Sequence, residues 1–292
     1  MATASAEYVC GKGTLLGECP IWDDRAQVLY WIDCRAPALL RLEPATGNTQ
    51  TVPLAETIGS FALRRGGGAV AALASGFHFL DLETGATTNI GDPEADRPDN
   101  RFNDGRADPA GAFWAGTMNR RHGGTDGTLY RLDPDGTIAA RFGGITVSNG
   151  LALSPDGRTL YFADSPTGTI FAFDLDLESG ELANRRIFVA PGVAPGYPDG
   201  SAVDAEGFLW NARWLAGCVA RFDPAGKLER TVKLPVARVT CCAFGGADLE
   251  TLYITTASHG ALKDGPPPEP LAGGLFAAHP GIVGLPESRF AG

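Results

Sequence analysis

Four residues with oxygen-bearing side chains stand at the same position of an internal repeat. They are Glu18, Asn103, Asn149 and Asp199, and each precedes an aromatic residue of its own repeat unit by 11 or 12 positions. Two carboxylates and two amide oxygens form a hard, all-oxygen donor set, and their two negative charges balance a divalent cation. Without a cation, two close carboxylates repel and raise each other's pKa. The spacing therefore predicts that these four residues are metal ligands.

Each residue taken alone has a simpler interpretation. Asn149 and Asp199 precede a glycine and Asn103 precedes Asp-Gly, which is typical of tight turns, while Glu18 could be a solvated loop acid. The shared position in the repeat favours the metal site over four separate turns. Asp104 stands one step outside this position, and we expect it to be a turn residue or a neighbour of the ligands.

Six short apolar and aromatic runs define the repeat. Their central residues are Tyr30, Val70, Trp114, Tyr161, Trp210 and Tyr253, at successive intervals of 40, 44, 47, 49 and 43 residues. Each run is followed by a second strand-like segment that ends in an acidic or glycine turn, such as "LYRLDPDG". Alternating apolar residues with polar turns indicate β-hairpins. A solenoid is the competing fold, but it needs polar caps and a shorter or more regular period.

These elements predict an all-β fold: a six-bladed β-propeller with four-stranded antiparallel blades, forming one domain over residues 1–292. The innermost strand of each blade faces a central channel, so one repeat position from several blades converges there and places the metal in the channel. In the two remaining blades this position falls near Ile58 and near Cys241 and Cys242. A thiol from the sixth blade is an alternative that would favour a softer metal such as Zn²⁺ or Fe²⁺.

Composition limits the partners. The formal net charge of -10, with only 24 Lys and Arg in 292 residues, argues against nucleic acid and anionic membranes. The N-terminus lacks a basic start followed by an apolar run, and no segment approaches the roughly 18 apolar residues that span a bilayer. We therefore expect a cytoplasmic protein with a small-molecule substrate and no required protein partner. The six cysteines contain no C-x-x-C pair, which indicates buried free thiols rather than disulfides.

Several segments together resemble the senescence-marker protein, gluconolactonase and luciferin-regenerating enzyme family. They are "LLGECPIWD", "RPDNRFNDGRADPAGAFWAGTM", "SNGLALSPDGRTLYFADS", "YPDGSAVDAEGFLWNARW" and "FGGADLETLYITTA". The resemblance implies a six-bladed propeller with one divalent metal in the channel. Its metal ligands correspond to Glu18, Asn149 and Asp199, with Asn103 close by. It further implies that Asp199 is the catalytic base and that Arg101 contacts substrate.

Two departures from the family pattern are visible. The first motif of the family usually reads G-E-G-P, whereas Cys19 replaces the small residue beside the ligand here. After "AGTM", where relatives often carry acidic residues that touch substrate, this chain reads "NRRHGG". The identity of the substrate therefore does not transfer across this loop.

The predicted activity is hydrolysis of an aldonolactone, of the gluconolactone, xylonolactone, arabinonolactone or galactonolactone type, to the free sugar acid. A divalent cation would polarise the ring carbonyl and Asp199 would accept the proton of the attacking water. Arg101, Asn103 and Asn119 would bind the lactone, with Arg120, Arg121 and His122 as further contacts at the rim. Ca²⁺ is the first choice of cation, and Zn²⁺, Mn²⁺, Mg²⁺ and Fe²⁺ are alternatives.

Two other functions remain open from the sequence. One is a phosphotriesterase or broad esterase on a related propeller, which would use the same type of cation site. The other is a non-catalytic calcium-binding propeller. Zinc-protease and serine-hydrolase mechanisms are disfavoured because the chain has neither H-E-x-x-H nor G-x-S-x-G.

Overall fold

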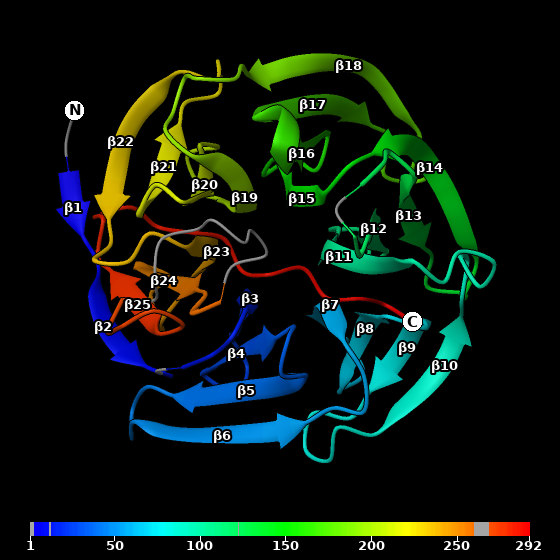
Figure 1. Cartoon of the computed structure of the whole chain (residues 1–292), viewed down its shortest axis with the longest axis horizontal. Coiled ribbons are helices and arrows are strands. Elements are labelled where there is room, and N and C mark those ends of the chain that lie inside the picture. Colours follow the sequence, from blue (N-terminus) through cyan, green and yellow to red (C-terminus); the bar gives the residue numbers. More distant parts are fainter. Residues whose placement is uncertain (1–2, 12, 122, 260–268) are drawn as a thin grey trace.

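The chain forms six β-sheets arranged as blades around a central channel (Figure 1). The computed structural model describes residues 3–11, 13–121, 123–259 and 269–292. Five of the sheets have four strands and one has five, and consecutive strands within each blade pair antiparallel. The predicted six-bladed β-propeller with four-stranded antiparallel blades is confirmed, with one extra strand in the fifth blade.

The blades are numbered in chain order, and their strands are given from the channel outward. Blade 1 has β3 (Gly17–Asp23), β4 (Val28–Asp33), β5 (Ala38–Glu43) and β6 (Asn48–Pro53); blade 2 has β7 (Ile58–Leu63), β8 (Ala69–Leu73), β9 (Gly76–Leu80) and β10 (Thr87–Gly91); blade 3 has β11 (Asn100–Ala107), β12 (Phe113–Asn119), β13 (Gly127–Leu132) and β14 (Ile138–Ile145). Blade 4 has β15 (Ser148–Leu153), β16 (Thr159–Asp164), β17 (Thr169–Leu175) and β18 (Leu182–Val189); blade 5 has β19 (Tyr197–Val203), β20 (Leu209–Trp214), β21 (Cys218–Phe222) and β22 (Leu228–Lys233); blade 6 has β23 (Val239–Gly245), β24 (Thr251–Thr256) and β25 (Leu275–Ala278).

The N-terminal segment closes the ring. Strand β2 (Glu7–Cys10) pairs antiparallel with β25 and becomes the outermost strand of blade 6, so the first and last parts of the chain share one sheet. Strand β1 (Thr3–Ser5) runs parallel to β22 at the outer edge of blade 5. The pairing of β2 with β25 gives blade 6 its fourth strand and ties the two ends of the chain together.

The second strand of each blade is the apolar run that defined the repeat. All six residues of β4 are buried, because both faces of a blade pack against neighbouring blades, whereas β6 at the perimeter buries only Val52. Aromatic side chains join adjacent blades. Trp22 stacks on Tyr253 between blades 1 and 6, with ring centroids 6.0 Å apart. The core is therefore a set of contacts between blades.

The channel has two distinct ends. The inner strands β11, β15 and β19 run in the same direction, because residues at their beginnings line one cavity and residues at their ends line another. At the ends of β11, β15 and β19, the segment 285–289 lines a cavity of ≈ 460 Å³. This C-terminal segment crosses the ring (Figure 1) and donates backbone hydrogen bonds from Gly284 to Leu249 and from Phe290 to Leu63. It therefore covers one end of the channel and joins blades 6 and 2.

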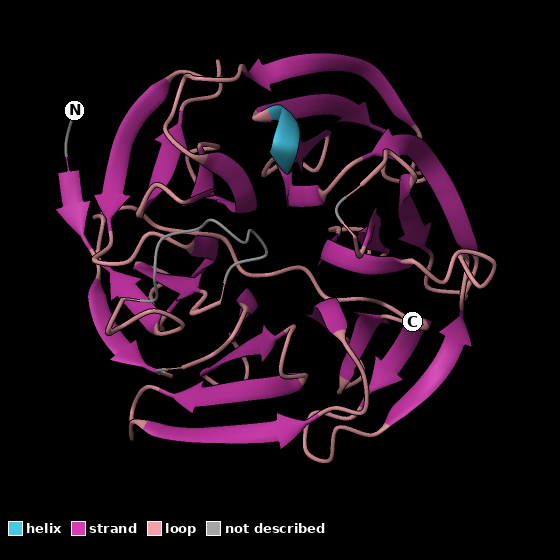
Figure 2. Ribbon diagram, viewed as in Figure 1, coloured by secondary structure: helices cyan, strands magenta, loops and turns pink. Residues whose placement is uncertain are grey.

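Helix is almost absent from the part of the chain that the structure describes. Its one helix is η1 (Ser165–Thr167), a single 3₁₀ turn after β16 (Figure 2). No helix among the described residues is long and apolar enough to cross a membrane. All six cysteines are free, and all but Cys10 are buried, as the sequence predicted.

Candidate metal centre and substrate cavity

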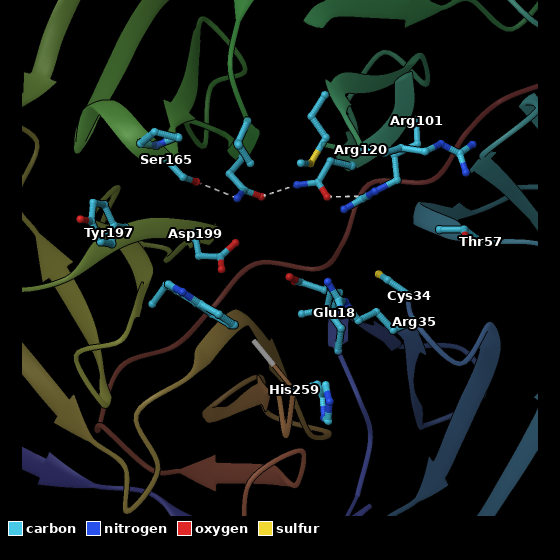
Figure 3. Close-up of a pocket in the computed structure, with 17 residues that line it drawn as sticks. Glu18, Cys34, Arg35, Thr57, Arg101, Arg120, Ser165, Tyr197, Asp199 and His259 are labelled. Atoms are coloured by element: carbon cyan, nitrogen blue, oxygen red, sulfur yellow. Dashed lines mark hydrogen bonds between the residues drawn. The ribbon is translucent and has the colours of Figure 1, made fainter. Parts of the chain in front are cut away.

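A cavity of ≈ 530 Å³ opens at the end of the channel where the inner strands begin. Glu18, Arg101, Asn103, Asn149 and Asp199 all line it, and they come from blades 1, 3, 4 and 5 (Figure 3). The four residues that share one repeat position therefore lie together in the channel, as predicted.

A β-bulge in each inner strand directs these side chains into the channel. In all six blades the register between the first and second strands shifts at the same level, for example between Glu18 and Ile21 and between Asn149 and Ala152. An extra residue in one strand bends it locally and re-aims the side chain beside it. The tight turns considered from the sequence are thus absent at these positions, and the Asn-Gly and Asp-Gly pairs lie inside strands.

Glycine follows the ligand position because the bulge is crowded. Gly150 has φ of +64°, where an L side chain is strained. A Cβ atom on Gly200 would lie 2.2 Å from Sγ of Cys241, so only glycine fits there. In blade 1 the equivalent residue is Cys19, with φ of +49°. Its thiol donates to the carbonyl of Phe61 at 3.5 Å and is not part of the cavity wall.

Two aspartates at the ends of second strands hold the segments that lead into the ligands. The carboxylate of Asp33 accepts two backbone N–H groups just ahead of Glu18, at 2.8 and 3.2 Å. Asp164 accepts the two equivalent N–H groups just ahead of Asn149, at 3.1 and 2.9 Å. Both carboxylates hold the backbone just before the inner strand begins. Asp33 and Asp164 occupy the same position of the repeat, three residues after its central aromatic residue.

A different pair of residues holds Asp199. Nδ2 of Asn211, on the neighbouring strand β20, donates to the backbone carbonyl of Asp199 at 2.6 Å and to Oγ of Ser201 at 2.9 Å. The buried Arg213 donates to the carbonyls of Pro195 and of the glycine that follows it, each at 2.9 Å. The strand that carries Asp199 is therefore tied to β20 by side chains as well as by the sheet.

A chain of hydrogen bonds orients the amides. Nδ2 of Asn149 donates to Oγ of Ser165 at 2.8 Å, and this hydroxyl donates to the carbonyl of Pro198 at 2.7 Å. Oδ1 of Asn149 consequently faces the cavity, where it accepts Nδ2 of Asn103 at 3.0 Å. Oδ1 of Asn103 accepts Nη1 of Arg101 at 2.8 Å. Asn103 thus directs its amide nitrogen toward Asn149, and its role as a metal ligand stays a prediction.

The carboxylates lack a positive partner at close range. Oδ1 of Asp199 is buried and has no hydrogen-bond partner among the described residues. Burial raises the pKa of Glu18 well above its usual value, and the charges of Asp199 and Asp104 raise it further. Burial and Asp104 raise the pKa of Asp199 in the same way. Deeper in the channel, burial raises the pKa of Asp104 to about 6. A divalent cation would relieve this repulsion, so the residues present fit one.

The donor set is unusual in being half amide. No group of three or more His, Cys, Asp or Glu side chains that could hold a metal occurs among the described residues. A site here therefore depends on amide oxygen as well as on Glu18 and Asp199, which favours hard cations. Cys241, the thiol considered as a softer ligand, packs against Gly200 and does not line the cavity.

The whole arrangement matches known proteins. The family model described as the SMP-30/Gluconolactonase/LRE-like region matches residues 16–258. The chain belongs to this family. It is 37% identical to regucalcin of Xenopus laevis over 100% of both chains, and 39% identical to a 6-deoxy-6-sulfogluconolactonase of Pseudomonas putida over 97% of this chain and 98% of the relative. Among solved structures, a calcium-binding regucalcin from Agrobacterium tumefaciens superposes with a TM-score of 0.90 at 30% identity, covering 99% of this chain and 98% of that one.

The residues of the loop that departs from the family pattern do not all line the cavity. Arg120 lines the cavity, as predicted for a rim contact. Asn119 does not: its Nδ2 donates to Asp126 at 3.2 Å and its Oδ1 accepts the N–H of Arg121 at 2.9 Å. A substrate contact through Asn119 stays a prediction. His122 lies outside the described residues.

Sequence reasoning missed further cavity residues at the ends of the second strands and on the loops that follow them. Cys34, Ser165 and Trp214 stand four positions after the aromatic residue of their repeat unit. His259 stands six positions after it, as does Arg120, which was predicted. This regularity was readable in the sequence. It was overlooked because the side chains differ in type from blade to blade, so no shared chemistry drew attention to the position.

Proposed function

We propose that this protein is a metal-dependent sugar lactonase that hydrolyses an aldonolactone to the free sugar acid. The observation that carries the proposal is the buried Oδ1 of Asp199, which has no described partner, while Asp199 lines a cavity of ≈ 530 Å³ together with Glu18 and Asn149. Such a volume accommodates a small ligand of this class. The relative named 6-deoxy-6-sulfogluconolactonase supports a carboxylic ester hydrolase that acts on lactones.

Glu18, Asn149 and Asp199 would hold the cation, with Asn103 as a fourth candidate. Ca²⁺ is our first choice because the donors are oxygens and because the Agrobacterium relative is described as a calcium-binding protein. Zn²⁺, Mn²⁺, Mg²⁺ and Fe²⁺ remain alternatives. A bound divalent cation supplies positive charge that polarises a carbonyl and offsets negative charge on its oxygen.

Asp199 acts as the general base. Its free carboxylate oxygen accepts a proton from a water molecule whose oxygen attacks the ring carbonyl carbon. The ring C–O bond then breaks, and the departing ring oxygen takes a proton to become a hydroxyl of the open acid. Arg101 orients the lactone by donating hydrogen bonds from the side of blade 3, and Asn103, whose Oδ1 accepts Nη1 of Arg101, is the further candidate contact on that side.

The opposite wall of the cavity is aromatic. Tyr197 and Trp214 line it from blade 5, and Figure 3 shows Tyr197 on the side away from Arg101. Aromatic rings present flat apolar surface to the C–H face of a sugar ring, while their polar edges stay solvated. The cavity therefore offers one wall of hydrogen-bond donors and one of apolar contact, which suits a polyhydroxylated ring.

A panel of gluconolactone, xylonolactone, arabinonolactone and galactonolactone tests the proposal by following acid release in a pH-stat. We expect activity to disappear on chelation and to return with added divalent cation. Asp199→Asn should lower kcat/KM by about 10³-fold or more, since it removes both the base and a ligand. The matched control is Asp96→Asn, an exposed carboxylate that does not line the cavity, which should retain full activity.

Three results would contradict the proposal. Full activity after metal removal would end the role assigned to the cation. Rapid hydrolysis of an organophosphate with no lactone turnover would favour a phosphotriesterase or broad esterase, and tight calcium binding without any turnover would favour a calcium-binding propeller.

The proposal also includes a cytoplasmic location. It further includes a small molecule as sole partner, without nucleic acid, membrane or required protein.

A further inference from the structure

We propose that the lactone carries an anionic group, a sulfonate, phosphate or carboxylate, remote from its ring carbonyl, and that Arg35 and Arg120 bind this group beside Arg101. The inference rests on the proposed lactonase function and names the substrate class within it. It concerns the wall of the cavity that carries Arg35, Arg101 and Arg120; of these three, the proposed chemistry uses only Arg101.

Three arginines gather on this wall. Arg35 follows β4 in blade 1, Arg101 lies in β11, and Arg120 follows β12 in blade 3; all three line the cavity. Figure 3 shows them with Thr57 on one side of the cavity, and Ser165 on the other. Burial lowers the pKa of Arg101; the negative charges of Cys34 and Glu18 oppose this shift, and the positive charges of Arg120 and Arg35 add to it.

None of the three arginines is paired with a carboxylate within 4.0 Å among the described residues. Arg101 uses Nη1 on the carbonyl of Phe102 and on Asn103, and Arg120 uses Nε on the carbonyl of Asn100 at 3.2 Å. The Nη groups of Arg120 and the entire guanidinium of Arg35 have no hydrogen-bond acceptor in the described part of the chain. Arginines without partners are common on exposed surfaces, but Arg35 and Arg120 line a cavity that also contains the half-buried Arg101.

The charge balance decides what this wall can bind. A divalent cation offsets Glu18 and Asp199, so the three guanidinium groups remain as unbalanced positive charge facing an entering ligand. A neutral sugar lactone offers only hydroxyl groups to them. An oxyanion accepts paired, charge-assisted hydrogen bonds from the planar guanidinium forks and relieves their mutual repulsion. The wall is therefore complementary to a ligand with a negative charge at the end opposite the reacting carbonyl.

The test compares gluconolactone with its 6-phospho and 6-deoxy-6-sulfo forms, which differ only in the remote group. We expect the wild-type protein to prefer an anionic form by about tenfold or more in kcat/KM, mainly through KM, and this preference should fall as salt concentration rises. The phosphate and sulfonate arms show which oxyanion fits better. Glucaro-lactone supplies the carboxylate arm.

Arg35→Gln and Arg120→Gln should each lower the ratio of kcat/KM for the preferred anionic lactone to kcat/KM for gluconolactone by about tenfold. The matched control is Arg158→Gln. Arg158 is also exposed and has no ion pair among the described residues, but it lies in the β15–β16 turn, next to the cavity at the other end of the channel. This variant should leave both substrates unaffected.

Equal activity on neutral and anionic lactones, unchanged in both arginine variants, would overturn the inference while leaving the lactonase proposal intact. If no lactone is hydrolysed, calorimetry with gluconate and 6-phosphogluconate separates the two ideas. Tighter binding of the phosphorylated acid that is lost in Arg35→Gln and Arg120→Gln would support the anion site without the activity. Equal binding of both acids would reject it.

Discussion

The two ends of the channel use the same residue types in opposite ways. At the open end, Oδ1 of Asp199 has no hydrogen-bond partner among the described residues, and none of the acidic or arginine side chains described in the cavity lining forms an ion pair. At the covered end, Arg106 binds both oxygens of Glu287, at 2.6 and 2.8 Å, and Arg289 binds Asp23 at 2.6 Å. A buried charge without a partner lowers stability, so such charges are typical of sites where a ligand supplies the partner. Paired charges instead stabilise the fold.

Arg106 connects the two ends. Its Nε donates to the carbonyl of Leu151 at 3.0 Å and its Nη2 to the carbonyl of Ser201 at 2.6 Å. These carbonyls lie two residues beyond Asn149 and Asp199 on β15 and β19. One guanidinium from blade 3 therefore fixes the spacing of two strands that carry candidate ligands, and Glu287 of the C-terminal segment holds it there.

The largest effect should come from breaking this pair. Glu287→Ala leaves Arg106 buried without its carboxylate partner, so we expect the free energy of unfolding to fall by about 3 kcal/mol. Urea denaturation measures it, and calorimetric titration with Ca²⁺ should show weaker binding because the ligand strands lose their spacing. Glu178→Ala, at an exposed turn of blade 4, is the control and should change stability by less than about 0.5 kcal/mol. An equal effect of both changes would contradict the role of the pair.

At the open end we expect removal of a charged group to raise the free energy of unfolding instead of lowering it. In chelated protein, Asp199→Asn removes one of the repelling carboxylates, and we expect the free energy of unfolding to rise by about 1 to 2 kcal/mol even though function is lost. Thermal unfolding in the presence of a chelator measures this change. A loss of stability would mean that Asp199 supports the fold and would erase the contrast between the two ends.

The open end should also respond to pH. The folded-state pKa values of Glu18 and Asp199 are raised, so the folded metal-free protein binds more protons than the unfolded chain and gains stability as the pH falls from neutral toward about 4. The gain is up to about 1.4 kcal/mol per pH unit for each proton. A bound cation keeps these groups ionised. The difference in Tm between metal-loaded and chelated protein should therefore shrink as the pH falls, and a constant difference would contradict the prediction.

The Asp23–Arg289 pair at the covered end should show the smallest effect on stability. Its contribution should fall at low pH, whereas the metal-free open end gains stability there. Burial alone would raise the pKa of Asp23, but hydrogen bonds from Arg289 and from the backbone of the next turn lower it. The stabilisation is therefore present above the unfolded pKa of about 3.9 and is lost as the pH falls through the folded value. Arg289→Gln should cost about 1 kcal/mol at pH 7 and less at pH 3, as measured by urea denaturation. An unchanged cost at pH 3 would exclude Asp23 as the source.

Much of the site could be predicted because the repeat carries it. Glu18, Asn149 and Asp199 share one position, and any fold that repeats a blade around an axis brings that position together. Asn119 shows the limit of this reasoning. It is adjacent in sequence to Arg120, yet one side chain lines the cavity and the other turns toward Asp126. Neighbours on a strand point to opposite faces, and the phase at a strand end is set by the loop that follows.

The sequence by itself determined the number of blades, their strand pattern and the convergence of the ligand position, because these follow from periodic local chemistry. Only the tertiary structure decided how the ring closes, since β2 joins β25 across nearly the whole length of the chain. It also decided which charges are paired. Arg106 and Glu287 are separated by 181 residues and meet only in the folded channel, whereas Arg35 and Arg120 find no carboxylate among the described residues. Pairing depends on distances between blades, and no local pattern encodes those distances.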